Sequence, residues 1–252
     1  MLKKQKRFFI FSQRRTGSTL LVSLLNSHPN IRCYSELFYP GRWNVHIRRL
    51  IKPLAFRHPL LYLNLVCLTT SRPVVGFKLM AHQNEALANL MERLVEQNWL
   101  VISIRRRNII ERVLSEAVLF TTRKPHSYGQ SMRSDEAIYI DPELFQRLLE
   151  QDRILTAREA KLLSHIPHIT LIYEEDLAHP QQWSTSTARV LTFLDVPVIP
   201  LTTKMVKTWE DPYEKLVSNY AELVQIVRTG SHVEEDTGNE TSSIQPRAKC
   251  KS

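Results

Sequence analysis

Four apolar runs rich in Ile, Val and Phe, each followed by helical periodicity, constrain the fold of this 252-residue chain most. Near-continuous apolar runs are typical of strands buried on both faces, and their alternation with helices predicts parallel strands. The predicted strands are residues 7–12, 73–80, 99–106 and 168–174. The predicted helices are residues 18–27, 84–97, 108–120, 142–165, 181–194 and 212–228. We therefore expect an α/β fold with a central parallel sheet flanked by helices on both faces, in which ligands bind beyond the carboxyl ends of the strands.

A chain of this length is expected to form one domain, here residues 1–228. Residues 229–252 are polar and lack periodicity, which predicts a disordered tail. The polar, turn-rich segment 121–140 is expected to form a mobile loop over the site. A leucine stripe in the predicted helix 142–165 indicates core packing, with a homodimer seam as the alternative: Leu144, Leu148, Leu155 and Leu162.

Cysteine usage and apolar run length limit the class of protein. Cys33, Cys67 and Cys250 are too scattered for a disulfide framework or a zinc site, which favours a reducing compartment. The basic start is followed by an apolar run too short for a signal peptide, and the run 59–68 is shorter than the ~20 residues of a membrane span. We expect a soluble, cytoplasmic protein without an integral membrane segment.

The formal net charge of +9 favours an anionic ligand. A nucleic-acid surface would interleave basic and aromatic side chains. Here the densest arginines follow the predicted strands instead, so we expect no nucleic-acid partner.

The stretch SQRRTGST after the first strand keeps the frame of the phosphate loop G-x-x-x-x-G-K-[ST], but with Ser12 for the first glycine and Ser18 for the lysine. Amides at the start of the next helix favour an anion, Gly17 permits a close approach, and Arg15 supplies charge. The alternative is a helix cap beside solvated arginines. The candidate anion-binding residues are Arg14, Arg15, Thr16, Gly17, Ser18 and Thr19.

A second cationic turn follows the strand at 99–106. Asn108 and Glu111 have the spacing of a helix capping pair, which leaves Arg105, Arg106 and Arg107 in the turn. Ser115 lies about two helical turns after Asn108, on the same stripe. An arginine and this hydroxyl could hold one phosphate from two sides, and the alternative is an ordinary helix serine.

Taken together, these motifs resemble the sulfotransferases that use 3′-phosphoadenosine 5′-phosphosulfate (PAPS), more narrowly the group that includes bacterial trehalose and carbohydrate sulfotransferases. The resemblance covers about residues 7–225 and implies a P-loop nucleotide-kinase-like sulfotransferase fold. It rests on SQRRTGSTLL, on the spacing of Arg107 and Ser115, and on CYSELF, VVGFKLM, LIYEEDLAHPQQW and YEKLVSNYAEL.

The resemblance also implies residue roles. Arg15 matches the cation beside the bridging phosphate oxygen, Thr16 to Thr19 match the cradle of the 5′-phosphosulfate, and Arg107 with Ser115 match the 3′-phosphate pair. Tyr173 matches a tyrosine near the adenine, although a buried strand-end aromatic is the alternative. A sulfonate carries less charge than a phosphoryl group, so arginine and oriented amides can suffice without a metal.

The resemblance suggests Glu36 as the general base, the alternative being a surface carboxylate or a partner of Arg14. His82 is the rival base, since imidazole titrates near neutrality. Lys78 either assists the sulfonate or forms a structural ion pair.

The chain is thus expected to transfer sulfonate from PAPS, in line, to a hydroxyl of a carbohydrate, lipid or small metabolite, leaving adenosine 3′,5′-bisphosphate (PAP). A metal-dependent P-loop-like kinase is the enzymatic alternative, although the loop lysine is absent. The second alternative is a basic protein without enzymatic activity, which binds nucleic acid or an anionic membrane.

Overall fold

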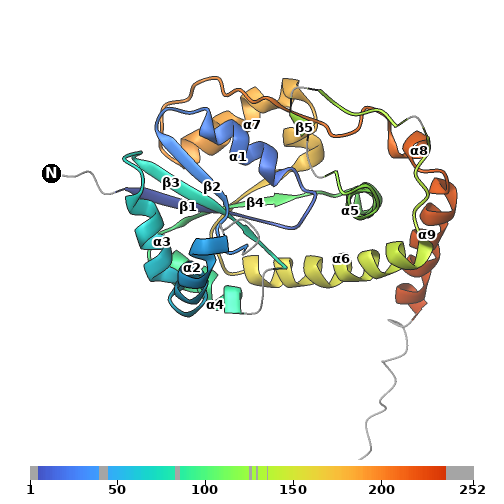
Figure 1. Ribbon diagram of the computed structural model, residues 1–252, viewed down its shortest axis with the longest axis horizontal. Coiled ribbons are helices and arrows are strands. Elements are labelled where there is room, and N and C mark those ends of the chain that lie inside the picture. Colours follow the sequence, from blue (N-terminus) through green and yellow to red (C-terminus); the bar gives the residue numbers. More distant parts are fainter. Residues whose placement is uncertain are drawn as a thin grey trace, which may run out of the picture.

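The protein, analysed as a computed structural model, is described over residues 5–39, 45–82, 86–124, 127–128, 130–134 and 136–236. A five-stranded parallel sheet in the order β2-β3-β1-β4-β6 forms its centre (Figure 1). The strands are β1 (Lys6–Ser12), β2 (Ile31–Glu36), β3 (Val74–Met80), β4 (Leu100–Arg105) and β6 (Ile169–Ile172). The predicted parallel sheet is therefore confirmed, and the four predicted strands correspond to β1, β3, β4 and β6.

Helices cover both faces of this sheet (Figure 1). Phe8 and Ile10 of β1 pack in a core with α1 and α7, whereas Phe9 and Phe11 point to the opposite face and pack in a core with α3 and α4. This alternation explains why β1 is apolar throughout. The helices are α1 (Ser18–Asn26), α2 (Val45–Arg57), α3 (Pro59–Leu68), α4 (Ala86–Glu96), α5 (Ile109–Thr122), α6 (Pro142–Leu163), α7 (Pro180–Phe193), α8 (Tyr213–Leu216) and α9 (Tyr220–Asp236).

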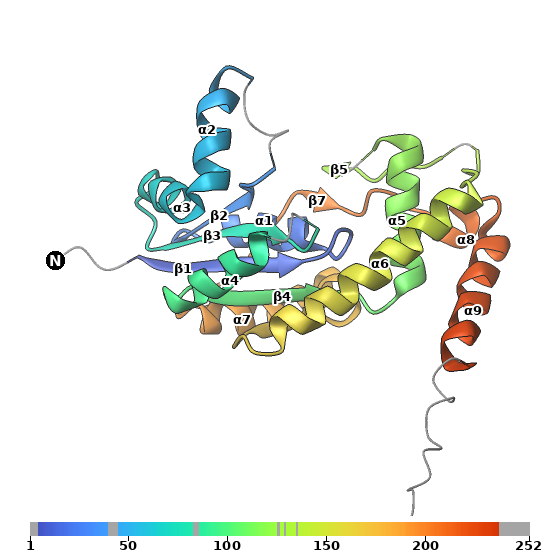
Figure 2. The ribbon, with the colours of Figure 1, turned by 90° about the horizontal axis from the view of Figure 1, so that it is seen from below.

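A third core joins α5, α6, α8 and α9 beyond the sheet (Figure 2). Part of the predicted loop 121–140 belongs to this region: β5 (Ser127–Tyr128) pairs antiparallel with β7 (Met205–Val206), and Ile138 bridges to Val217. The loop is thus paired with the segment 205–217; residues 125, 126, 129 and 135 lie outside the described residues.

Two helix predictions differ in part from the structure. The predicted helix 212–228 is divided into α8 and α9, and α9 continues to Asp236; the rest of the predicted tail lies outside the described residues. The predicted core packing of the leucine stripe is confirmed in part, because Leu148 and Leu162 are partly buried against the cores. The most buried residues of α6 are others, and two of them are carboxylates: Phe145, Leu149, Asp152, Glu159 and Leu163.

The topology fixes where a ligand can bind. Because β1 and β4 are parallel neighbours, the turns that follow them meet at the same edge of the sheet. Among the described residues, no helix combines the length and the apolar character needed to span a bilayer.

Candidate functional site

The β1–α1 turn is shaped by two residues with left-handed backbone conformations. Arg15 has φ 58° and Gly17 has φ 83°. A Cβ atom at position 17 would lie 2.6 Å from Cδ2 of Tyr173, so this position requires glycine. Gly17 caps α1 without a side-chain hydrogen bond, which leaves the first amides of α1 available to an anion.

The side chain of Thr16 does not contribute to that anion site. It is fully buried, and its hydroxyl donates to the carbonyl oxygen of Gln13 at 3.0 Å, inside the turn itself. Thr16 therefore stabilises the turn and can offer only its backbone amide.

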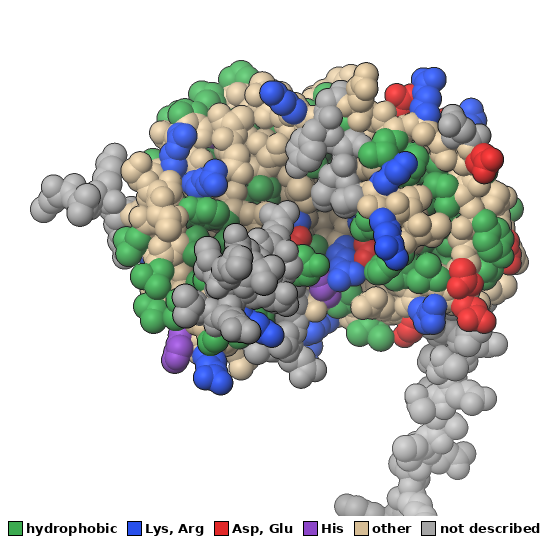
Figure 3. All heavy atoms as spheres, in the orientation of Figure 1, with side chains coloured by type: hydrophobic (Ala, Val, Ile, Leu, Met, Phe, Trp, Pro, Cys, Tyr) green, Lys and Arg blue, Asp and Glu red, His purple; other side chains and the backbone are tan. Residues whose placement is uncertain are grey.

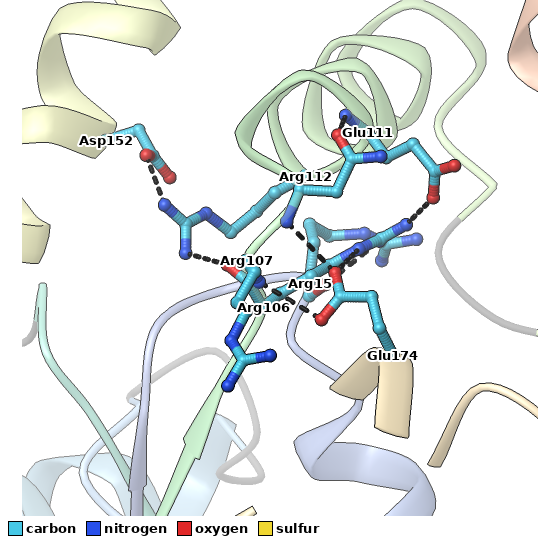
Figure 4. Close-up of polar contacts among 8 residues, drawn as sticks. Arg15, Arg106, Arg107, Glu111, Arg112, Asp152 and Glu174 are labelled. Carbon is cyan, nitrogen blue, oxygen red and sulfur yellow. Dashed lines mark hydrogen bonds and ion pairs between the residues drawn. The ribbon is translucent and has the colours of Figure 1, made fainter. Parts of the chain in front are cut away.

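The β4–α5 turn places Arg106 and Arg107 in different environments (Figure 4). Arg106 is buried, lies 4.7 Å from the ring centroid of Tyr173, and donates to the carbonyl oxygen of Arg15 at 3.2 Å. It also forms an ion pair with Glu111. The buried cation at this turn is therefore Arg106.

Arg107, the predicted phosphate ligand, points away from Arg106 in Figure 4. Its side chain is 66% exposed and forms an ion pair with Glu175. Glu174 accepts hydrogen bonds from the amides of Arg107 and Asn108 at 3.1 and 3.0 Å. Side chains, rather than these two amides, must therefore hold an anion at this turn.

The predicted cap of α5 is present in part. The side chain of Asn108 accepts a hydrogen bond from the amide of Glu111 at 3.0 Å, as the capping pair predicts. The Glu111 carboxylate turns instead to Arg106.

Besides the bond from Arg106 to the carbonyl oxygen of Arg15, a second hydrogen bond links the first turn to the helix that follows the second turn. Nε of Arg15 donates to Oγ of Ser115, on α5, at 2.7 Å. Burial lowers the pKa of Arg15, because a desolvated guanidinium is less stable as a cation. The arginine of the first predicted anion site and the hydroxyl of the second thus lie in one place.

Glu36 and Lys78, two of the predicted catalytic residues, lie beside the first turn. Nζ of Lys78 lies 2.9 Å from Oε1 of Glu36 and donates to Oγ1 of Thr19 at 3.1 Å. Lys78 is buried and the Glu36 carboxylate is partly exposed.

His82, the rival base, is held in its neutral form. Its burial and then the positive charge of Arg14 lower its pKa to about 4. Nε of Arg14 also donates to Nε2 of His82 at 3.3 Å, which occupies the lone pair that a base would use. Arg14 pairs with Glu116 at 2.7 Å, and not with Glu36 as the alternative had it.

These residues line a single cavity of about 960 Å³, which forms the hollow near the centre of Figure 3. Arg107 and Thr16 are the predicted site residues absent from its lining. Its polar lining includes Arg14, Arg15, Gly17, Ser18, Thr19, Glu36, Lys78, His82, Arg106, Ser115, Glu116 and Tyr173. Another part of the lining combines apolar and aromatic side chains (Tyr39, Leu119, Phe120, Met205, Val206 and Trp209) with the charged Arg123, Lys207 and Asp211.

Known proteins were compared with the chain at the level of family, sequence and structure. No protein-family profile and no curated protein sequence matches it. Among solved structures, a sulfotransferase from Alicyclobacillus acidocaldarius is similar to it with a TM-score of 0.50 and 15% identity, over 90% of this chain and 96% of that one. The chain has a sulfotransferase-like fold.

A second similar structure is shikimate kinase from Bacteroides thetaiotaomicron, with a TM-score of 0.41 and 12% identity over 76% of this chain and 99% of that one. In parallel sheets such as this one, ligands bind beyond the carboxyl ends of the strands, where the turn after β1 lies. Arg15 and Gly17 lie in that turn here.

Proposed function

We propose that the protein transfers a sulfonate group from PAPS to a hydroxyl group. The hydrogen bond between Arg15 and Ser115 carries this proposal, because it brings two cationic turns into one cavity. PAPS has a phosphosulfate on the 5′ side of its ribose and a phosphate on the 3′ side. A protein that binds it therefore needs two neighbouring anion sites.

The residues present fit such a donor. On the 5′ side, the amides of α1, the hydroxyls of Ser18 and Thr19, and the charges of Arg15 and Lys78 converge. On the 3′ side, Ser115 lies beside Arg106 in the cavity lining, and Arg107 could join them by leaving Glu175. A cavity of about 960 Å³ is within the upper range of ligand pockets and leaves room for an acceptor.

Tyr173 provides an aromatic surface for the adenine in this proposal. Its ring lines the cavity, its Cδ2 edge lies close to Gly17, and the Arg106 guanidinium lies 4.7 Å from its centroid. Burial raises the pKa of its hydroxyl, so the ring stays neutral.

In the proposed reaction the donor supplies an activated sulfonate whose leaving group is a phosphate. Arg15 would stabilise the negative charge that develops on this phosphate, and burial strengthens that interaction by excluding water. Lys78 and the amides of α1 would neutralise the sulfonate oxygens. Such preorganised donors are typically worth on the order of 10² to 10³ in rate each.

Glu36 is the proposed general base. Lys78 links its carboxylate to Thr19 of the β1–α1 turn, so the base would lie close to the site of transfer. His82 is less suited, because its pKa of about 4 and its hydrogen bond from Arg14 make it a poor proton acceptor.

The acceptor would occupy the part of the cavity lined by Leu119, Met205 and Trp209. Apolar and aromatic side chains there favour a hydroxyl on a molecule with an apolar portion over a free sugar.

Isothermal titration with PAP and with Mg-ATP tests the proposed function. We expect PAP to bind without magnesium and ATP to bind more weakly. Binding of Mg-ATP alone would favour the kinase instead. Mass spectrometry of a metabolite extract incubated with the protein and labelled PAPS would then identify the acceptor.

A further inference from the structure

A long stretch of the chain carries no negative charge. Between Glu36 and Glu85 the sequence has no Asp or Glu, although the whole chain has 25 acidic residues. This stretch, which includes α2, α3 and β3, has seven basic residues: Arg42, Arg48, Arg49, Lys52, Arg57, Arg72 and Lys78. Lys78 is buried and lines the cavity, whereas Lys52, Arg57 and Arg72 are exposed. Among the described side chains, α2 exposes two basic residues, Lys52 and Arg57, and α3 has no charged residue.

The same helices expose large apolar side chains. Leu61, Leu65 and Leu68 of α3 are 52%, 46% and 79% exposed, and their i, i+4, i+7 spacing places them on one stripe. Phe56 at the end of α2 is also exposed. Scattered single apolar residues are normal on a surface, but a leucine stripe beside basic residues indicates an interaction site.

The mouth of the cavity continues this apolar character. Tyr39, Phe120 and Val206 line the cavity and are themselves exposed. In Figure 2, α2 rises on one side of the molecule and the end of α5 with β5 on the other, both from the same side of the sheet. Figure 3 looks onto this side of the molecule.

We propose that this face, formed by α2, α3 and the cavity mouth, docks onto an anionic lipid surface. Lys52 and Arg57 would lie near the lipid headgroups while the leucine stripe enters the interface, as in helices that lie on membranes. The surface needed for docking is outside the proposed donor pocket, so this inference goes beyond the proposed function.

Charge argues against two other occupants. In a symmetric dimer the same patch meets its own copy, so an acid-free basic surface would face like charges. A nucleic acid would neutralise the basic side chains but leave the leucine stripe exposed to water. An anionic lipid surface would neutralise the basic side chains and also bury the leucine stripe.

Co-sedimentation with phosphatidylcholine vesicles, with and without phosphatidylglycerol, tests the proposal. We expect binding only to the anionic vesicles, and weaker binding as salt rises. Lys52→Gln and Arg57→Gln should each lower the partition coefficient about five-fold. The triple variant Leu61→Ser, Leu65→Ser, Leu68→Ser should lower it ~10-fold or more.

Matched controls lie on other surfaces. Lys161→Gln and Lys215→Gln remove the same charge at exposed positions, and Ile154→Ser removes a side chain that is 59% exposed on α6. These variants should bind vesicles like the wild type, and every variant should bind PAP normally. The proposal is overturned if anionic vesicles are not bound, if the controls lose as much binding, or if the triple variant only dissociates a dimer in light scattering. If the wild type bound anionic vesicles but not PAP, the sulfotransferase proposal would be refuted and the docking proposal would stand.

Discussion

Replacing Gly17 by alanine should disrupt both the stability of the β1–α1 turn and the site that it forms. At φ 83° an L-residue costs roughly 1–2 kcal/mol. The new Cβ would also lie 2.6 Å from Cδ2 of Tyr173 and 3.4 Å from Cδ1 of Leu177, and such overpacking costs roughly 1–3 kcal/mol. Together these terms predict a loss of about 2–5 kcal/mol in the free energy of unfolding.

Urea unfolding measures this loss, and calorimetry with PAP measures its effect on the site. Gly76→Ala is the matched control, because its Cβ would meet the ring of Phe8 at 2.3 Å in the core, away from the cavity. Both variants should be destabilised, but only Gly17→Ala should also weaken PAP binding by the folded protein, since Tyr173 must move. A Gly17→Ala variant as stable as the wild type would refute the geometry of this turn.

Four further substitutions test the account: two are measured by activity or ligand binding, and two by the stability of the protein. Glu36→Gln should lower turnover by about 10²–10⁴ while PAP binding stays unchanged in calorimetry; normal turnover would exclude Glu36 as the base. Because His82 has a pKa of about 4 rather than 6.5, the unfolded chain takes up a proton first as pH falls through this window. The wild type should therefore lose stability between these pH values, on the order of 1.4 kcal/mol per unit, and His82→Gln should lose less in urea titrations. Glu175→Gln should release Arg107 and tighten PAP binding by about two- to five-fold, as for an exposed ion pair; unchanged affinity would mean that Arg107 does not bind the donor. Asp152→Ala should cost about 3–5 kcal/mol in unfolding, because it leaves a buried arginine without its partner.

The sheet could be predicted from the sequence because its strands are buried on both faces. Residues 7–12 and 73–80 are apolar almost throughout, and they form β1 and β3 with small shifts at their ends. The helices α2 and α3 were not predicted as helices. Pro53, a residue that usually interrupts helices, lies inside α2, and α3 is apolar all round and therefore shows no amphipathic period.

The two cationic turns could be predicted because each follows an apolar strand and precedes a helix. The residues that contact these turns in the folded protein could not be predicted. Three consecutive arginines carry no local signal for which one is buried, and burial of Arg106 depends on Tyr173 and Glu111. Similarly, Glu116 became a site residue only because the fold brings Arg14 against α5. Tertiary packing, which a local pattern does not encode, decides both placements.

The most direct test of a single site formed by two turns compares PAP with adenosine 5′-monophosphate by calorimetry. These ligands differ only in the 3′-phosphate, whose charge-assisted hydrogen bonds are worth roughly 1.5–3 kcal/mol. We predict that the wild type binds PAP about 10- to 100-fold more tightly, and that the double variant Arg107→Ala, Ser115→Ala loses this preference but keeps its affinity for the monophosphate. Equal affinities in the wild type, or a preference that survives in the double variant, would contradict the two-turn site.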